Sequence, residues 1–152
     1  PFMKFDKNRR RLVQGLLALT ALALTPLRVW ARNIEAFQAT SPDAALQSLF
    51  GDKALSDSDQ VQLKVPDIAE NGAVVPVTIE SSLAGVSSIS IIVVENPNPL
   101  SARFQVMPGV AANISTRIKM GTSSDVIAAV ETEQGVYLAR KNVKVTIGGC
   151  GG

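Results

Sequence analysis

The sequence contains no histidine, and it contains a single cysteine among its 152 residues. Histidine is the usual general base near neutral pH and the commonest metal ligand, so its absence excludes Ser-His-Asp and Cys-His catalytic arrangements. A single cysteine excludes an intrachain disulfide and a thiolate metal cluster. The sequence therefore predicts no catalytic residue, no metal site and no bound cofactor.

Aromatic residues are also scarce, at 5% of the chain, although hydrophobic residues reach 46% and the mean hydropathy is +0.20. This apolar content is sufficient for a packed core, and the length fits one domain once a targeting segment is removed. Val, Ile, Ser and Thr recur through the second half of the chain. This bias favours β-strands over helices.

The basic residues gather near the N-terminus. Residues 1–31 hold six of the 15 Lys and Arg but one of the 13 Asp and Glu, so nine basic and twelve acidic residues follow, a net charge of −3. Nucleic-acid binding needs clustered Lys and Arg. We therefore expect no nucleic-acid partner.

The N-terminal segment has the three parts of an export signal. The run Asn8-Arg9-Arg10-Arg11-Leu12-Val13-Gln14 resembles the twin-arginine consensus, a moderately apolar stretch follows up to Leu27, and Val29-Trp30-Ala31 provides a small-residue cleavage site. An uncleaved anchor is the alternative, but a spanning helix needs about 20 apolar residues, and this stretch is shorter. The sequence predicts a twin-arginine signal peptide over residues 1–31, cleaved after about Ala31, a periplasmic location and no stable membrane anchor.

One helical segment is expected between Ile34 and Phe50. Ser41 is suited to the N-cap and Pro42 to the first turn. Leu46, Leu49 and Phe50 then fall on one helix face, and Gly51 can end the helix. We interpret this short N-terminal segment as a packing helix without a site.

The rest of the chain has the pattern of short strands separated by turns. The expected strands are Val61–Val65, Val75–Glu80, Ser88–Glu95, Ala102–Met107, Ile114–Met120, Asp125–Glu133 and Val136–Ile147. The turn signals are Glu70-Asn71-Gly72, Leu83-Ala84-Gly85, Asn96-Pro97-Asn98-Pro99, Pro108-Gly109 and Gln134-Gly135. This spacing predicts an all-β fold, an immunoglobulin-like antiparallel β-sandwich over residues 32–147. Residues 68–77 are interpreted as strand, turn and strand without chemistry.

The only cysteine lies in a run of glycines, Gly148-Gly149-Cys150-Gly151-Gly152. Glycine has no side chain to pack and loses the most backbone freedom on ordering, so the sequence predicts a flexible arm over residues 148–152. The alternating strand that ends at Ile147 gives this arm an anchored base. An extended chain would carry Cys150 about 10 Å beyond Ile147.

Several roles are open to Cys150. It can be incidental, it can form an interchain disulfide in a secreted interaction module, or it can carry a covalent cargo to other enzymes. Catalysis is less well supported, because an ordinary exposed thiol is only a few per cent thiolate at pH 7. Arg140, Lys141 and Lys144 are near in sequence, and we expect them to form a solvated strand face.

A resemblance to a known family distinguishes these roles. The chain resembles SoxY, the sulfur-carrying subunit of the bacterial thiosulfate-oxidising Sox system. The resemblance covers essentially the whole chain, including the twin-arginine leader. It rests on residues 143–152, which are very similar to the family's terminal signature, and on residues 66–77, 95–100 and 115–120.

The resemblance implies a function for the arm. It implies that thiosulfate-derived sulfur is held covalently on Cys150, on an arm formed by Gly148, Gly149, Gly151 and Gly152, and that the protein is a carrier subunit and not an enzyme. The implied partners are SoxZ in a heterodimer, the cytochrome SoxAX, which joins thiosulfate to the cysteine, the thiosulfohydrolase SoxB, and SoxCD where it is present.

Overall fold

The computed structural model describes residues 34–146. The chain divides into two compact units, residues 1–32 and 33–152, and only the second contains described residues. The expected signal peptide over residues 1–31 and the expected arm over residues 148–152 lie outside them. No helix among the described residues is long and apolar enough to cross a membrane.

The helical segment forms as two short helices, α2 (Ile34–Gln38) and α3 (Pro42–Phe50). Ser41 is the N-cap of α3, and its Oγ accepts a hydrogen bond from the backbone N–H of Ala44 at 3.2 Å. At the other end Gly51 adopts φ +57° and donates its N–H to the carbonyl of Gln47 at 2.8 Å. The predicted cap and end of α3 are therefore confirmed.

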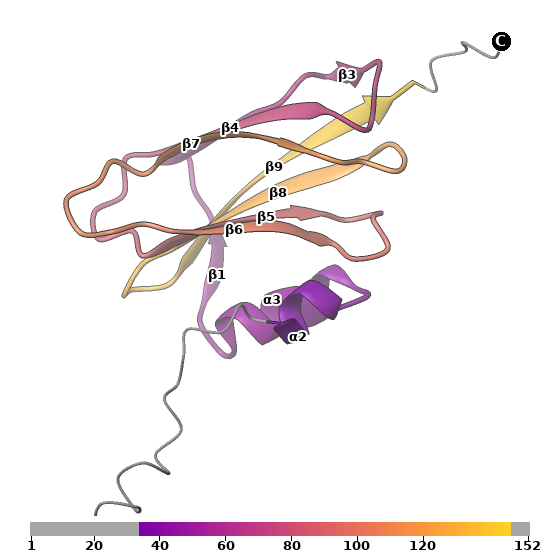
Figure 1. The fold of residues 1–152 in the computed structure, drawn as a ribbon. Helices are drawn as coiled ribbons and strands as arrows, with labels where there is room; N and C mark the ends of the chain where they lie inside the picture. The colour runs from indigo at the N-terminus through magenta and orange to yellow at the C-terminus, as the bar shows by residue number, and fades with distance from the viewer. Residues whose placement is uncertain (1–33, 147–152) are drawn as a thin grey trace, which may run out of the picture. The chain divides into compact units, whose positions relative to one another are not determined.

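Within residues 34–146, nine strands form two sheets. They are β1 (Leu55–Asp57), β2 (Val61–Lys64), β3 (Ile68–Ala69), β4 (Val75–Ser81), β5 (Ser88–Val93), β6 (Leu100–Gln105), β7 (Asn113–Ile118), β8 (Ser124–Glu131) and β9 (Val136–Val145). The larger sheet has the order β1-β9-β8-β5-β6, with β3 also paired to β9, and the smaller has the order β2-β4-β7. The all-β sandwich is confirmed (Figure 1).

The central strands of the larger sheet, β5 and β8, are buried on both faces. Ile89, Ile91 and Val93 of β5 point toward the smaller sheet and join the core between the two sheets. Ile92 of β5 instead joins a second core with Phe50 and other residues of α3. Figure 1 shows α2 and α3 on the side of the larger sheet away from the smaller one. This double burial explains why all six residues of β5 are buried, Ser88 and Ser90 included.

Each of the seven predicted strands is present, with ends shifted by up to two residues. The strand β1 was not expected, and neither was the parallel pairing of β1 and β3 with β9. These two strands have three and two residues, too few to show the period of two that identifies a strand in sequence. They extend the pairing of β9 along one edge.

Candidate functional site

The described chain ends at Thr146, four residues before Cys150. Cys150 and its neighbours Gly148, Gly149, Gly151 and Gly152 lie outside the described residues. The part of the site that the structure describes is therefore the end of the last strand, Lys144, Val145 and Thr146, which we call the arm root. Figure 1 shows β9 and β3 reaching the same end of the sandwich.

Hydrogen bonds hold the arm root on both edges. On one edge the backbone N–H of Lys144 donates to the carbonyl of Asp67 at 2.9 Å, and that of Thr146 donates to the carbonyl of Ala69 at 3.0 Å. On the other edge the N–H of Val145 donates to Ser123 Oγ at 2.9 Å. All three backbone donors of the arm root are paired. The strand is therefore fixed up to its last described residue.

The side chains of β9 anchor the same segment. Val143 is fully buried in the core between the sheets, and Val145 packs partly buried against that core. The alternation predicted for this strand is confirmed at these two residues, while Ile147 lies outside the described part of the chain. Each fully buried apolar side chain stabilises the folded state by roughly 1.5–3 kcal/mol. This burial therefore keeps the end of β9 in the sheet.

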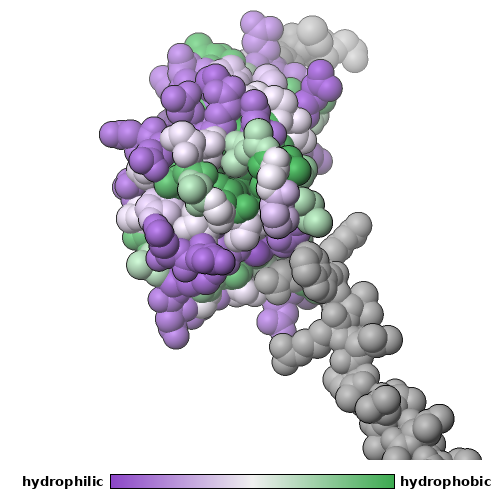
Figure 2. Space-filling model, turned by 90° about the vertical axis from the view of Figure 1, so that its left-hand side faces the viewer, coloured by the Kyte–Doolittle hydropathy of each residue, from purple (hydrophilic) through white to green (hydrophobic). Residues whose placement is uncertain are grey.

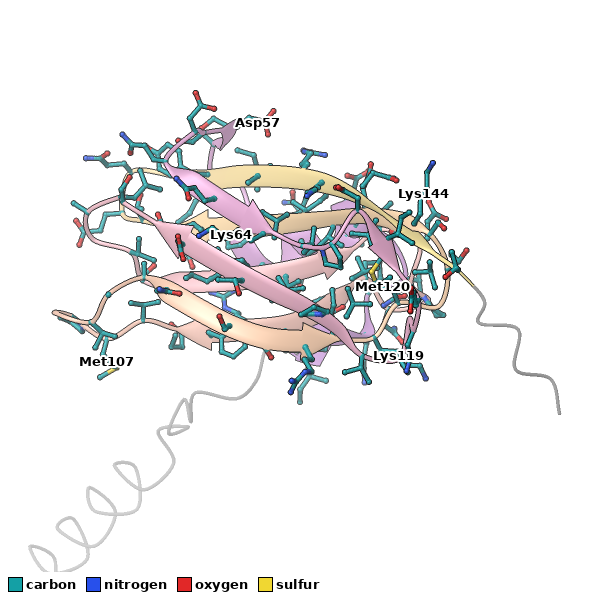
Figure 3. All side chains as sticks on the ribbon, turned by 90° about the horizontal axis from the view of Figure 1, so that it is seen from above. Asp57, Lys64, Met107, Lys119, Met120 and Lys144 are labelled. Carbon is teal, nitrogen blue, oxygen red and sulfur yellow. The ribbon has the colours of Figure 1, made fainter. Side chains whose placement is uncertain are left out.

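The three cations near the arm differ in their contacts. Arg140 Nε lies 3.7 Å from Asp57 Oδ1, and Lys141 Nζ lies 3.0 Å from Asp67 Oδ1. Both pairs are exposed enough to contribute little stability. Lys144 is exposed at the arm root, and Figure 3 shows it at the opposite end of the sandwich from Met107. Arg140 and Lys144 are exposed as expected, with Lys144 next to the arm, whereas Lys141 is half-buried and its Nζ also donates to the carbonyl of Val65 at 2.9 Å.

One charged group among the described residues has a clearly shifted pKa. Burial raises the pKa of Glu131, but hydrogen bonds from Lys53 Nζ at 2.6 Å and Ser88 Oγ at 2.7 Å, with the charges of Lys53 and Arg103, more than offset it. The pKa of Glu131 is therefore below its ordinary value. Arg103 Nη2 lies 3.0 Å from the same carboxylate, and Arg103 Cζ lies over the ring of Phe50, 5.6 Å from its centroid. This cluster joins α3 to the sheet and is structural.

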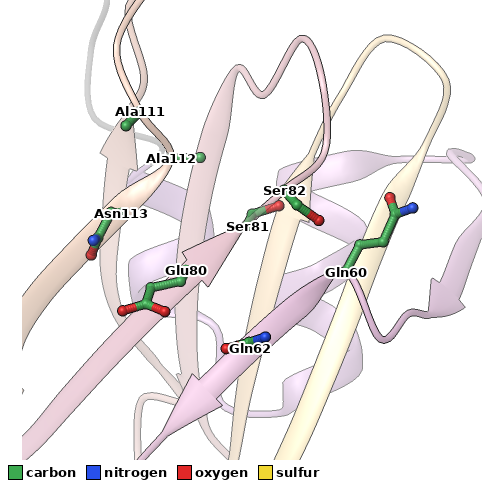
Figure 4. A pocket seen from close by; sticks show the side chains of 8 residues that line it. All are labelled: Gln60, Gln62, Glu80, Ser81, Ser82, Ala111, Ala112 and Asn113. Atoms are coloured by element: carbon green, nitrogen blue, oxygen red, sulfur yellow. The ribbon is translucent and has the colours of Figure 1, made fainter.

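The surface hollows of the described residues lack catalytic groupings. One, close to 320 Å³, lies at the far end of β4 from the arm root, lined by Gln60, Gln62, Glu80, Ser81, Ser82, Ala111, Ala112 and Asn113 (Figure 4). It brings together amides, hydroxyls and one carboxylate, with no nucleophile beside a base. Within residues 34–146, no cluster of three or more His, Cys, Asp or Glu could hold a metal ion.

Apolar side chains gather at the end of the sandwich that lies away from the arm root. Figure 2 shows them on the face that is turned to the left in Figure 1. Met107 and Val110, in the connection from β6 to β7, are each 62% exposed. This surface does not adjoin the arm root, so it is separate from the candidate site.

Sequence patterns did not reveal which residues hold the arm root. Asp67, Ala69 and Ser123 act through backbone carbonyls or one hydroxyl that nothing in their sequence context distinguishes. Gly72 lies in a turn that was predicted from Asn71-Gly72. Its packing against β9, described below, depends on the tertiary fold.

The family model described as Sulfur oxidation protein SoxY matches residues 46–150 of the chain. The chain belongs to the SoxY family. The matched segment includes α3 from Leu46 onward, all nine strands and Cys150. Membership supports a carrier role in sulfur oxidation, within a Sox system of several proteins.

One solved structure supports this assignment, and a second shares the fold. The sulfur carrier protein SoxY from Chlorobium limicola f thiosulfatophilum is 38% identical with a TM-score of 0.64, over 69% of this chain and 96% of that one. The superoxide reductase (neelaredoxin) from Ignicoccus hospitalis matches 72% of this chain and 96% of its own, with 17% identity and a TM-score of 0.52. The second likeness shows a shared fold only. No protein with a curated description matches the sequence.

Proposed function

We propose that this SoxY-family protein is a periplasmic carrier that holds thiosulfate-derived sulfur on Cys150 and presents it to the other Sox proteins. The observation that carries the proposal is the family match, which runs through the only cysteine of the chain. The arm root supports it, because three paired backbone amides and two packed valines provide a fixed base four to seven residues before that cysteine.

The proposed loading step is an oxidation. The Cys150 thiol and thiosulfate form an S–S bond and give Cys150–S–S–SO₃⁻, one proton and two electrons. A c-type cytochrome of the SoxAX kind accepts the electrons. The carrier contributes the thiol sulfur, and the cytochrome is the oxidant.

The proposed unloading step is a hydrolysis. Water attacks the terminal sulfonate sulfur of Cys150–S–S–SO₃⁻, and the bond between that sulfur and the sulfane sulfur breaks. Sulfate and two protons are released, and the persulfide Cys150–S–S⁻ remains on the protein. A thiosulfohydrolase of the SoxB kind would catalyse this step, and SoxCD would oxidise the remaining sulfane sulfur where it is present. We assign both reactions to partner enzymes, since the sequence contains no histidine and no second cysteine.

The location and the stable partner belong to the same proposal. The leader over residues 1–31 would direct the folded protein through the twin-arginine route to the periplasm. Pairing with a SoxZ subunit before export would explain the use of a route for folded proteins. An unpaired cysteine in an oxidising compartment is open to intermolecular chemistry, which a carrier uses.

Reconstitution with the other Sox proteins tests the proposal. Replacing Cys150→Ser should abolish thiosulfate oxidation while the circular dichroism spectrum and the binding of the SoxZ subunit stay unchanged. Replacing the exposed Ser56→Ala is the matched control and should leave oxidation unchanged. Full activity of the Cys150→Ser protein would refute the proposal. Activity found only in a reductant-sensitive covalent dimer would favour a disulfide-linked module instead.

A further inference from the structure

A single segment crosses the arm root, and its two ends are fixed independently. We call residues 65–73 the strap. At its start Lys141 Nζ donates to the carbonyl of Val65 at 2.9 Å and lies 3.0 Å from Asp67 Oδ1. Near its end the N–H of Met120 donates to the carbonyl of Gly72 at 2.7 Å. Between these points β3 forms its parallel pairing with β9.

Gly72 brings the strap closer to β9 than any other residue would allow. A Cβ atom added to Gly72 would lie 2.9 Å from Val145 Cγ1 and would clash with the carbonyl oxygen of Met120. Gly72 does not adopt the left-handed backbone region, so alanine could take its backbone conformation. Space alone excludes a side chain here. Glycine at position 72 is therefore required by the close approach of Met120 and of Val145 in the arm root, not by the turn.

We infer that the strap sets the point at which the arm leaves the sandwich, and that Gly72 is a positioning residue for Cys150. The position of the strap follows from the contacts above. Its effect on sulfur transfer rests on the proposed function. With the strap in place, the chain from Thr146 to Cys150 spans four residues, at most about 14 Å. Without it the fixed chain would end at Val143, and the seven residues to Cys150 could span about 25 Å.

A longer arm would lower the rate of transfer. Once a partner has docked, the effective concentration of a tethered group falls roughly as the −3/2 power of tether length. Lengthening the arm from four to seven residues would lower it about two- to threefold. The strap thus keeps the arm short and its starting point constant.

Amide hydrogen exchange measured by NMR tests the geometric part. Gly72→Ala should speed exchange of the Lys144 and Thr146 amides about tenfold, because both donate to the strap. The Val145 amide has both neighbours released and should exchange faster too, whereas the Val143 amide, inside the pairing of β9 with β8, should change little. Gly121→Ala is the matched control, since its added Cβ would meet only Asn96 Oδ1 at 3.8 Å. Unchanged exchange at Lys144 and Thr146 in Gly72→Ala would overturn the inference.

A second variant covers the case in which Gly72→Ala does not fold. Lys141→Gln removes the contacts that fix the start of the strap and leaves Gly72 in place. It should speed exchange of the Lys144 amide more than that of Thr146. If the Lys144 and Thr146 amides exchange at the same rates in Lys141→Gln as in the wild-type chain, the inference is overturned.

Transfer kinetics with a purified thiosulfohydrolase test the consequence. Gly72→Ala should raise the apparent KM for the loaded carrier about two- to threefold with kcat unchanged. Deleting Gly148 and Gly149 should weaken transfer in the wild-type chain and restore it in Gly72→Ala, an effect that loss of stability alone would not give. Faster exchange without this restoration would overturn the length-setting role. If Cys150 carries no sulfur at all, the proposed function fails while the exchange results still stand.

Discussion

The backbone N–H of Thr146 donates to the carbonyl oxygen of Ala69 at 3.0 Å, which links the last described residue to a strand 77 residues earlier. The hydrogen bond belongs to a two-residue parallel strand and gives the end of β9 a partner on its outer edge. A chain end with an unpaired edge would fray. The pairing allows a rigid sandwich to continue to within four residues of its only cysteine.

Replacing Asn96→Ala should loosen the loop that holds the strap. Asn96 Nδ2 donates to the carbonyl of Lys119 at 2.8 Å, and its Oδ1 accepts from the N–H of Gly121 at 3.1 Å. These contacts flank Met120, whose N–H donates to Gly72. We expect a loss of about 1–2 kcal/mol in the free energy of unfolding and faster exchange of the Met120 amide.

Asn98→Ala is the control for this prediction. Asn98 Nδ2 donates to the carbonyl of Ala39 at 3.4 Å, which is long for a hydrogen bond. Its loss should change stability by no more than about 0.5 kcal/mol. Equal effects of the two replacements in urea unfolding would contradict the role given to Asn96.

Replacing Glu131→Gln should lower the free energy of unfolding at pH 7 and reduce the amount by which it falls on acidification. The pKa of Glu131 is below its ordinary value of 4.5, so the charged form stabilises the fold above that value. This stabilisation disappears as the pH falls through the lowered pKa of the folded chain. At pH 7 the replacement should cost about 1–3 kcal/mol, because Arg103 and Lys53 lose their shared carboxylate.

The pH profile distinguishes this effect from a simple packing change. Urea unfolding from pH 7 down to pH 3 should show a smaller loss of stability in Glu131→Gln than in the wild-type chain. Glu80→Gln is the control, since its pair with Lys64 is exposed and should contribute less than about 1 kcal/mol. Parallel profiles for wild type and Glu131→Gln would show that this carboxylate does not contribute to acid sensitivity.

Replacing Ser41→Ala should destabilise the helical layer. The Oγ of Ser41 accepts from the N–H of Ala44 at the start of α3, and loss of an N-cap side chain costs about 1 kcal/mol. Ser56→Ala, at an exposed position of β1, should change stability by less than about 0.5 kcal/mol. Thermal unfolding followed by circular dichroism measures both.

Structure that depends on a residue and its immediate neighbours, such as a helix cap or a strand, could be predicted from the sequence. Ser41 and Gly51 bracket α3 as expected, because capping depends on the residue itself and its immediate neighbours. The strand expected over Ser88–Glu95 is present as β5, and its consecutive apolar residues Ile91 to Val93 are buried by the helices on one side and the smaller sheet on the other.

Contacts between distant residues could not be predicted in this way. The strand β3 pairs in parallel with β9, and Ile68 on it is 57% exposed, so no burial pattern marks it. Gly72 was assigned to a turn, although its lack of a side chain serves the packing of Val145. Glu131 meets Lys53 and Arg103 across 78 and 28 residues, a distance that no local pattern spans.

Intact-mass spectrometry of the carrier during thiosulfate oxidation tests the central claim most directly. The protein, quenched while oxidation proceeds, should carry the –S–SO₃⁻ group or one sulfane sulfur on Cys150, and reductant should remove either. Peptide mapping should place the added mass on the C-terminal peptide, and the Cys150→Ser variant should carry none. An unmodified thiol throughout active oxidation, or the same adduct on Cys150→Ser, would contradict the claim that Cys150 carries the sulfur.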